Sequence, residues 1–322
     1  MPAVWWVTNG NDSGSGSLRA QYEAAEAAGN GQEIIIADEV SVITLSSPLD
    51  SGAMNFTTIE ITGEDPSNRP VIKASTEGAH QFLNHSGNNG VTIILEHLKF
   101  ENFGANVVVE NGITVNFGHG GVIKTVAPLY LVHCDFLNNV AEGNGGAIFS
   151  EYSIAAEDCL FFTNFAGADG GAIYSEPENT AAGISITDCE FNLNSATDDG
   201  GAICFKTVAG TLGIYGDSTV FIMNGAGDKG GAVFQFGGAI EAISSSSADT
   251  GTSGFQFDVD SGIGNDLFLE ELELAHIDIV VNGTGAGDSI FLHSFIPPSQ
   301  NNYWSDINES RVSGGINSNW PI

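Results

Sequence analysis

The apolar residues of this chain lie in short runs, and turn-forming residues separate one run from the next. The segments "LYLVHC" (129–134) and "GAIFS" (146–150) are typical. They favour β-strands, because their apolar residues lack the spacing of three, four and seven that an amphipathic helix needs. The glycine pairs and asparagines between the runs are common turn residues. The pattern therefore predicts many short strands joined by tight turns.

The runs recur in register. Glycine pairs begin at residues 120, 145, 170, 200 and 230, at intervals of 25, 25, 30 and 30 residues. Three further columns keep the same step: Phe136, Phe161, Phe191 and Phe221; Asn139, Asn164, Asn194 and Asn224; and Ala141, Ala166, Ala196 and Ala226. Strands repeating at this period predict a solenoid whose coils stack at about 4.8 Å. We expect an all-β fold, a single-stranded right-handed parallel β-helix of about ten coils.

Each column should have one physical role. We expect Phe161 and Phe191 to stack inside the rod. Asn164 and Asn194 should stack at one turn, where asparagine can bond the backbone and tolerates the left-handed conformation. The glycine pairs should supply a positive φ at a corner that has no room for a Cβ atom.

The N-terminal part predicts a cap for the first coil. Within "GSLRAQYEAAEAAG", Ser17 is a suitable N-cap and Gly29 ends the helix. The expected apolar face consists of Leu18, Tyr22, Ala25 and Ala28. We therefore divide the chain into an N-terminal strand and capping helix (1–33), a parallel β-helix (34–300) and a C-terminal extension (301–322).

Two other segments extend the repeat. In "LKFENFGANV" (98–107), Phe100 and Ala105 fit their columns, whereas Phe103 stands where asparagine is expected. Towards the C-terminus, "GIGNDLFL" from Gly262 and "GAGDSIFL" from Gly285 repeat at an interval of 23 residues. We expect shorter coils there.

The charge balance limits the possible partners. Eight Lys and Arg residues face 40 Asp and Glu residues, which gives a formal net charge of -32. Such a chain repels nucleic acid and anionic lipid. No segment has the length and hydrophobicity to span a membrane, so we expect no membrane insertion. Residues 1–14 also lack the basic and apolar regions of a signal peptide. Export would then follow removal of a signal or another route, such as host lysis by a virus.

The four cysteines indicate packing and not metal binding. Cys134, Cys159 and Cys189 share one repeat position, and Cys204 takes the place that Phe149 has in its own copy. No CxxC pair is present, which argues against zinc. We expect four reduced thiols, with the first three in one buried column.

Two sequence patterns resemble a known group of surface proteins. The segment "VTNGNDSGSGSLRAQYEAAEAAGNGQEIIIAD" (7–38) is similar to the N-terminal cap of many bacterial right-handed β-helix surface proteins. The paired F-x-x-N and G-G-A-[ILV] motifs resemble the repeats of the polymorphic outer-membrane protein family of adhesins and autotransporters. The resemblance covers roughly residues 5–240. It implies a passenger-like β-helix exposed at a surface.

A polysaccharide-degrading enzyme is the main alternative. The "GHG" segment (118–120) and the pair Asp198–Asp199 resemble elements of polygalacturonase-type hydrolases, but in reversed order and without a following Arg-x-Lys. The pair also occupies a repeat position, so a turn role is the simpler interpretation. A lyase would need a positioned basic residue, and the eight Lys and Arg residues are dispersed.

Calcium is the only cofactor that the sequence suggests. "SGIGNDLFL" (261–269), which contains Asp266, nearly matches a calcium-binding nonapeptide, with one further near-copy. Asp169 and Asp199 share a turn column, and Asp228 lies one place out of it. Stacked carboxylates at the coil spacing repel each other unless an ion or protons lie between them. The alternative is that these acids are solvated surface residues.

The longest repeats contain "SEPENTAAG" (175–183) and "KTVAGTLG" (206–213), which place five added residues at about the same point of adjacent coils. Loops on one side of a solenoid can form a binding face, although neutral drift accounts for them equally well. We interpret the chain as a non-enzymatic, extracellular structural or adhesive module. It would lie on a cell surface or on a virion as a fibre, spike or decoration protein. The expected partner is a protein or glycan on a cell or particle surface, and a homo-oligomer is an alternative.

Overall fold

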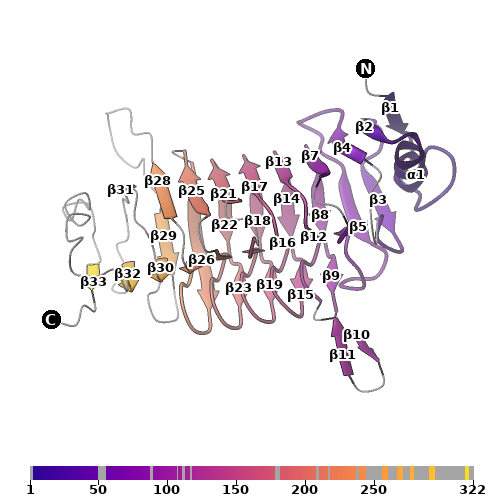
Figure 1. Ribbon diagram of the computed structural model, residues 1–322. Helices are drawn as coiled ribbons and strands as arrows, with labels where there is room; N and C mark the ends of the chain where they lie inside the picture. Colours follow the sequence, from indigo (N-terminus) through magenta and orange to yellow (C-terminus); the bar gives the residue numbers. More distant parts are fainter. Residues whose placement is uncertain are drawn as a thin grey trace.

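The computed structural model shows a rod of stacked coils with a helix at its N-terminal end (Figure 1). The structure describes residues 3–49, 56–87, 90–106, 108–110, 113–116, 118–177, 182–207, 210–216, 218–236, 239–243, 256–259, 267–270, 276–278, 290–293 and 316–318. Its three large sheets, which we name A, B and C, consist of parallel strands, and each strand pairs with its counterparts in the neighbouring coils. The predicted parallel β-helix is therefore confirmed.

Sheet A has ten strands in the described part of the chain, in agreement with about ten coils. They are β1 (Ala3–Val7), β2 (Asn30–Ile36), β4 (Phe56–Gly63), β7 (Thr92–Glu96), β13 (Leu129–Val132), β17 (Ile154–Glu157), β21 (Ile184–Thr187), β25 (Thr211–Tyr215), β28 (Ala239–Ile243) and β31 (His276–Asp278).

Sheet B runs as two rows that meet in one longer strand, β26 (Val220–Ala226). Its first row is β3 (Val42–Leu45), β5 (Val71–Ala74), β8 (Lys99–Glu101), β14 (Asp135–Leu137), β18 (Leu160–Phe162) and β22 (Glu190–Asn192), and β29 (Gln256–Val259) follows β26. Its second row is β9 (Gly104–Ala105), β15 (Val140–Ala141), β19 (Phe165–Ala166) and β23 (Ser195–Ala196).

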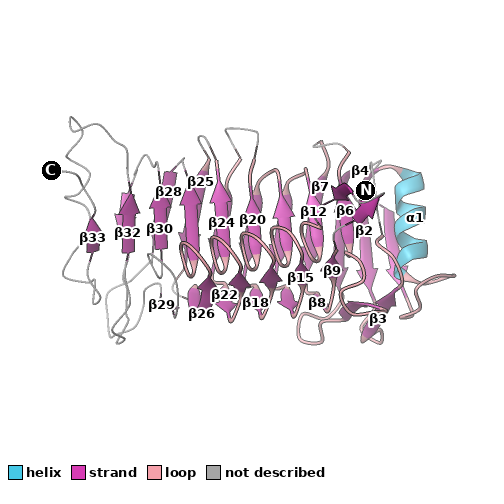
Figure 2. Cartoon of the chain, turned by 90° about the horizontal axis from the view of Figure 1, so that it is seen from below, coloured by secondary structure: helices cyan, strands magenta, loops and turns pink. Residues whose placement is uncertain are grey.

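Sheet C forms the remaining side of the rod, as the second view shows (Figure 2). Its strands are β6 (Leu83–His85), β12 (Ile123–Thr125), β16 (Ile148–Ser150), β20 (Ile173–Ser175), β24 (Ile203–Lys206), β27 (Val233–Phe236), β30 (Leu267–Glu270), β32 (Ile290–His293) and β33 (Ile316–Ser318). A hairpin of β10 (Val108–Glu110) and β11 (Ile113–Asn116) projects from the rod (Figure 1).

The core is a stack of identical side chains. Phe136, Phe161, Phe191 and Phe221 are fully buried, and their rings follow one another at centroid distances of 4.9, 4.6 and 4.8 Å. The rings are nearly parallel, because parallel strands in register place each ring directly over its copy in the next coil. The predicted phenylalanine column is confirmed.

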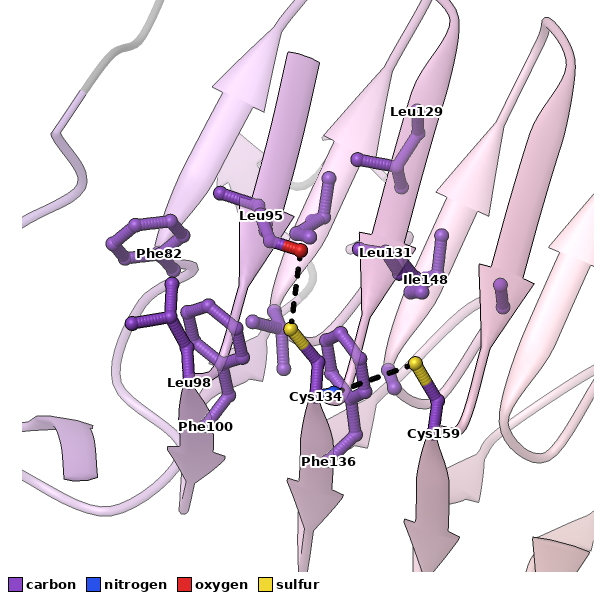
Figure 3. Close-up of a cluster of buried hydrophobic side chains, with 14 of the residues drawn as sticks. Phe82, Leu95, Leu98, Phe100, Leu129, Leu131, Cys134, Phe136, Ile148 and Cys159 are labelled. Carbon is purple, nitrogen blue, oxygen red and sulfur yellow. Dashed lines mark hydrogen bonds between the residues drawn. The ribbon is translucent and has the colours of Figure 1, made fainter. Parts of the chain in front are cut away.

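The cysteine column is also confirmed. Cys134, Cys159 and Cys189 are buried, free thiols. The backbone N–H of Cys134 points to Sγ of Cys159 at 3.5 Å, and that of Cys159 to Sγ of Cys189 at 3.4 Å. Figure 3 shows the first of these contacts beside Phe136, together with the Sγ of Cys134 directed at the carbonyl oxygen of Leu95.

The capping helix α1 (Leu18–Ala28) covers the first coil. Ser17 is its N-cap and accepts the backbone N–H of Ala20, and Gly29 is its C-cap, both as predicted. Leu18, Tyr22 and Ala25 are buried, but Ala28 is exposed. The prediction for Ala28 was wrong because, at about 100° per residue, its side chain is turned roughly 90° from the mean direction of the three buried residues. No helix in the described part of the chain has the length and apolar character needed to cross a membrane.

Both extensions of the repeat keep the expected register. Phe100 pairs with Phe136, and the backbone N–H of Phe103 donates to Oδ1 of Asn139, so Phe103 ends the asparagine column. At the other end Leu267 pairs with Ile290, which is the interval of 23 residues. The domain boundaries at residues 33 and 300 stay predictions.

The two adjacent coils that each gained five residues do not place them alike. In the first of these coils, eight residues (176–183) separate the paired positions of β20 and β21. In the coil before it, only three residues (151–153) separate those of β16 and β17, so the whole first addition falls here. In the next coil, six residues (206–211) separate the paired positions of β24 and β25. Four residues (216–219) then separate those of β25 and β26, whereas two separate those of β21 and β22. The second addition is therefore divided three and two between neighbouring corners. Repeat length alone does not show where inserted residues lie.

Candidate functional site

Besides the glycine pairs, two columns of residues with left-handed backbone mark corners of the repeated coils. One column of such residues is Asn138, Thr163, Leu193 and Met223, with φ between 53° and 56°. The other is His133, Asp158 and Asp188, with φ of 50° or 51°. The predicted asparagine stack at one turn is confirmed, and the left-handed conformation belongs to the residue immediately before each asparagine. The asparagines instead bond across coils.

The stacked asparagines form a continuous, fully buried ladder. Nδ2 of Asn164 donates to the carbonyl of Phe136 at 3.0 Å and to Oδ1 of Asn194 at 2.9 Å. Its Oδ1 accepts the backbone N–H of Asn139 at 3.1 Å and Nδ2 of Asn139 at 3.0 Å. Each amide thus satisfies groups of two neighbouring coils, which a buried polar side chain requires.

The glycine pairs have the predicted role. Gly145, Gly170 and Gly200 have φ of 71°, 68° and 68°. At the second glycine of a pair, such as Gly146, an added Cβ would meet the carbonyl oxygen of the second glycine of the next coil, Gly171. The first glycine is needed for its conformation and the second for close packing of the coils.

A second polar column runs along the turn before each glycine pair. The backbone N–H of Asn144 donates to Nδ1 of His119 at 2.9 Å, and that of Asp169 donates to Oδ1 of Asn144 at 3.2 Å. The series continues from the N–H of Asp199 to Oδ1 of Asp169 at 3.0 Å, and from that of Lys229 to Oδ1 of Asp199 at 3.2 Å. We call these five residues the turn column. Its side chains hold one coil to the next.

Two carboxylates meet in the turn column. The Nζ of Lys206 lies 2.7 Å from Oδ2 of Asp169 and pairs with it. Burial and then the charge of Asp169 raise the pKa of Asp199 to about 6, and Lys206 and Lys229 oppose this rise. The two carboxylates therefore repel, as expected for stacked acids, and a proton on Asp199 relieves the repulsion in weakly acidic solution.

An aromatic column lies beside the turn column on the outer side of sheet C. Phe149, Tyr174, Cys204 and Phe234 follow in register and form a separate buried cluster. The hydroxyl of Tyr174 donates to Oε2 of Glu176 at 2.7 Å. Burial and then this bond to the carboxylate raise the pKa of Tyr174.

A hollow of about 510 Å³ lies over this column, where the added residues of two coils begin. It is lined by Phe149, Glu151, Glu176, Pro177, Lys206, Thr207 and Phe236. The hollow thus combines two carboxylates and an ammonium group with one exposed aromatic side chain. Lys206 is already paired with Asp169, and Glu176 already accepts the Tyr174 hydroxyl.

The predicted calcium residues do not gather into one site. Asp169 and Asp199 are neighbours in the turn column, where both carboxylates accept backbone N–H groups. Asp228 is exposed and lies one place outside the column, as the sequence indicated, while Asp266 falls outside the described residues. In the described part of the chain, no group of three His, Cys, Asp or Glu side chains could hold a metal ion. Calcium binding stays a prediction.

The residues of the enzyme alternative are also spread along the rod. His119 and Asp199 belong to the same column, but Asn144 and Asp169 stand between them, so they lie three coils or about 14 Å apart. Asp198 is exposed at the turn, and its carbonyl accepts the backbone N–H of Asp228. His119 and the Asp198–Asp199 pair therefore do not converge on one bond, as the resemblance to a polygalacturonase-type hydrolase would require.

Comparison with known families confirms the repeat resemblance. The model of the Chlamydia polymorphic membrane protein repeat matches residues 133–151, 158–176 and 188–206. Each match begins at a left-handed corner and includes one phenylalanine and one asparagine of the two columns. It ends at the strand that follows the glycine pair or one residue after that strand. One family repeat therefore corresponds to most of one coil. No curated protein and no solved structure matches the chain.

Proposed function

We propose that this protein is a non-enzymatic structural or adhesive module displayed outside the cell. It would lie on a cell surface, or on a virus particle as a fibre, spike or decoration protein. The observation that supports the proposal is that the side chains of the asparagine column and the turn column form hydrogen bonds from one coil to the next. Asn164, Asp169 and Asp199 each use their side-chain oxygens to bind a neighbouring coil. These groups build a rod instead of converging on a substrate.

The family repeat supports display at a surface. The matched repeat takes its name from a membrane protein family, and here three copies of it form the middle of the rod. A long rod of identical coils also presents an extended, regular surface, on which loops and exposed side chains can vary while the columns stay constant.

The partner that fits this surface is a protein or a glycan on a cell or particle. The chain has a formal net charge of -32 and therefore repels nucleic acid and anionic membranes. Self-association into a homo-oligomer is compatible with the same surface, since exposed apolar residues such as Phe165 and Met223 are 41% and 53% accessible.

Localisation tests the proposal. Antibodies raised against the full chain should label the exterior of intact cells or virus particles from the source culture in immunoelectron microscopy. Brief treatment of the intact cells or particles with protease should remove the label. Label that appears only after the cells are opened would contradict extracellular display.

A polysaccharide hydrolase is the second candidate, and the raised pKa of Asp199 is the observation that favours it. A carboxyl group that is protonated near pH 6 can serve as a general acid. The test is incubation of the protein with pectin, alginate and uncharged glycans, with and without calcium, followed by assays for new reducing ends and unsaturated products. We expect no turnover. Cleavage that Asp199→Asn abolishes would establish the enzyme instead.

A further inference from the structure

The outer face of sheet A contains a trough that neither candidate function uses. It has a volume of about 270 Å³ and crosses β13, β17, β21 and β25. Four residues that pair in register across these strands run along it: Tyr130, Ala155, Ser185 and Gly213. One large side chain is thus followed by three small ones on consecutive coils.

A tyrosine closes each end of the trough. Tyr130 stands out from β13 with 46% of its surface accessible. At β25 the ring of Tyr215 lies over Gly213, because a Cβ added to Gly213 would collide with the ring and hydroxyl of Tyr215. Ala155 and Ser185 form the floor between them. Strand spacing places β13 about 14 Å from β25, which is enough for a short stretch of sugar rings.

The trough is uncharged. None of the residues that line it is Asp, Glu, Lys, Arg or His, although the chain has 40 acidic residues. Glu157, the next outward-facing residue of β17 after Ala155, lies outside the lining. The hollow over the aromatic column differs in this respect, because Glu151, Glu176 and Lys206 line it.

These features fit one class of ligand. The apolar face of a sugar ring packs against tyrosine rings, and the hydroxyls of Ser153, Ser185 and Thr211 are available at the trough to bond sugar hydroxyls. A charged ligand would lose hydration without gaining a charged partner. An extended peptide would need an open strand edge, yet β17 and β21 are paired on both sides.

We propose that the trough between Tyr130 and Tyr215 binds an uncharged glycan. This proposal rests on the adhesive function proposed above and gives it a ligand. Binding leaves every bond of the glycan intact, since no carboxyl group lines the trough and glycoside hydrolysis needs a pair of them.

The test uses the full chain and soluble polysaccharides. Dextran, mannan, galactan and xyloglucan are the uncharged probes, and hyaluronan and polygalacturonate are the anionic ones. In isothermal titration, at least one uncharged probe should bind, with an affinity that changes less than twofold between 50 and 500 mM NaCl. The anionic probes should not bind.

Two variants with matched controls locate the site. Tyr130→Ala removes one wall and Ser185→Arg fills the floor, and each should weaken binding by roughly tenfold or more. Phe165→Ala removes an exposed aromatic residue elsewhere, and Ser195→Arg places the same arginine on sheet B. Both controls should bind as the unmodified chain does. Thermal melting checks that all four variants fold.

Hydrogen–deuterium exchange of the unmodified chain gives a measure that does not depend on any variant. Saturation with the bound polysaccharide should slow exchange in β13, β17, β21 and β25. Four results would overturn the proposal: no uncharged probe binds at millimolar concentration, only anionic probes bind, binding survives both trough variants, or protection maps elsewhere. Surface labelling without glycan binding would reject the trough alone and leave the adhesive function standing.

Discussion

Replacing Asp199 by asparagine should stabilise the folded protein at neutral pH and leave its stability near pH 4 almost unchanged. The Oδ1 of Asp199 accepts the backbone N–H of Lys229. Asn144, two coils earlier in the turn column, does the same with an amide oxygen and accepts the N–H of Asp169. Asparagine at position 199 therefore keeps the hydrogen bond and removes a negative charge that lies close to another.

The size of the expected stabilisation follows from the raised pKa of Asp199. Burial and then the Asp169 carboxylate raise the pKa of Asp199 from 3.8 to about 6, against the opposing charges of Lys206 and Lys229. For a group fully shielded from water, this change corresponds to about 3 kcal/mol. Asp199 is only half-buried, and solvent screening reduces the expected stabilisation to about 1 kcal/mol.

The direction of the pH dependence follows from the protons that the folded and unfolded chains bind. Between about pH 4 and pH 6, folded Asp199 holds a proton that the unfolded chain has released. The free energy of unfolding therefore falls as the pH rises through this range. The contribution of this carboxyl is complete below its unfolded pKa and is lost above its folded pKa. Asp199→Asn removes this part of the pH dependence.

Denaturant unfolding of the full chain at pH 4 and pH 7.5 measures the effect. Asp198→Asn is the matched control, because it removes the same charge from the adjacent, exposed turn residue. We expect Asp199→Asn to exceed the control by about 1 kcal/mol at pH 7.5 and to equal it at pH 4. Equal stability of the two variants at pH 7.5 would refute the reasoning, and so would a gain of the same size at both pH values.

Three further predictions concern the columns. Asn164→Ala should cost about 3–5 kcal/mol in denaturant unfolding, because it leaves several buried groups unbonded, whereas Asn192→Ala on the half-buried surface should cost under about 1 kcal/mol. Leu193→Asn should raise the free energy of unfolding by about 0.5–1 kcal/mol, because asparagine adopts the left-handed conformation more readily than leucine; a loss of stability would count against this. Leu137→Asn, without a positive φ, should give no such gain. All four thiols should react with a thiol reagent at pH 8 only after denaturation, since the cysteines are fully or nearly fully buried; fast labelling of the folded protein would contradict this.

The sequence allowed most of the rod to be predicted, because a solenoid repeats one environment many times. Phe161 and Phe191 stack in register, and so do Asn164 and Asn194, since each residue lies on its own copy in the next coil. A column of identical large apolar residues at a fixed period is typical of such stacking. The glycine pairs were equally informative. A positive φ at the first position and the lack of space for a Cβ atom at the second both favour glycine.

The left-handed corners were predictable only in part. One column contains His133, Asp158 and Asp188, and aspartate at two of its positions is a usable turn signal. The other ends in Leu193 and Met223, which are poor residues for a positive φ. The buried asparagine that follows each of them stabilises the turn through its bonds across coils, so the corner residue itself is free to vary. The determinant of the corner thus lies at the neighbouring position.

The proposed glycan site depends on the register between coils more than on residue type. The net charge of the chain suggests an acidic surface everywhere, yet the trough of sheet A has no charged residue in its lining. Its neutrality appears only when Tyr130, Ala155, Ser185 and Gly213 are placed on consecutive coils, and this requires the added residues to be divided between two corners. Treating 206–213 as one loop would remove Gly213 from sheet A and Tyr215 from the end of the trough. A displacement of two residues in the sequence therefore decides whether the outer face of sheet A contains the uncharged trough that we propose as a glycan site.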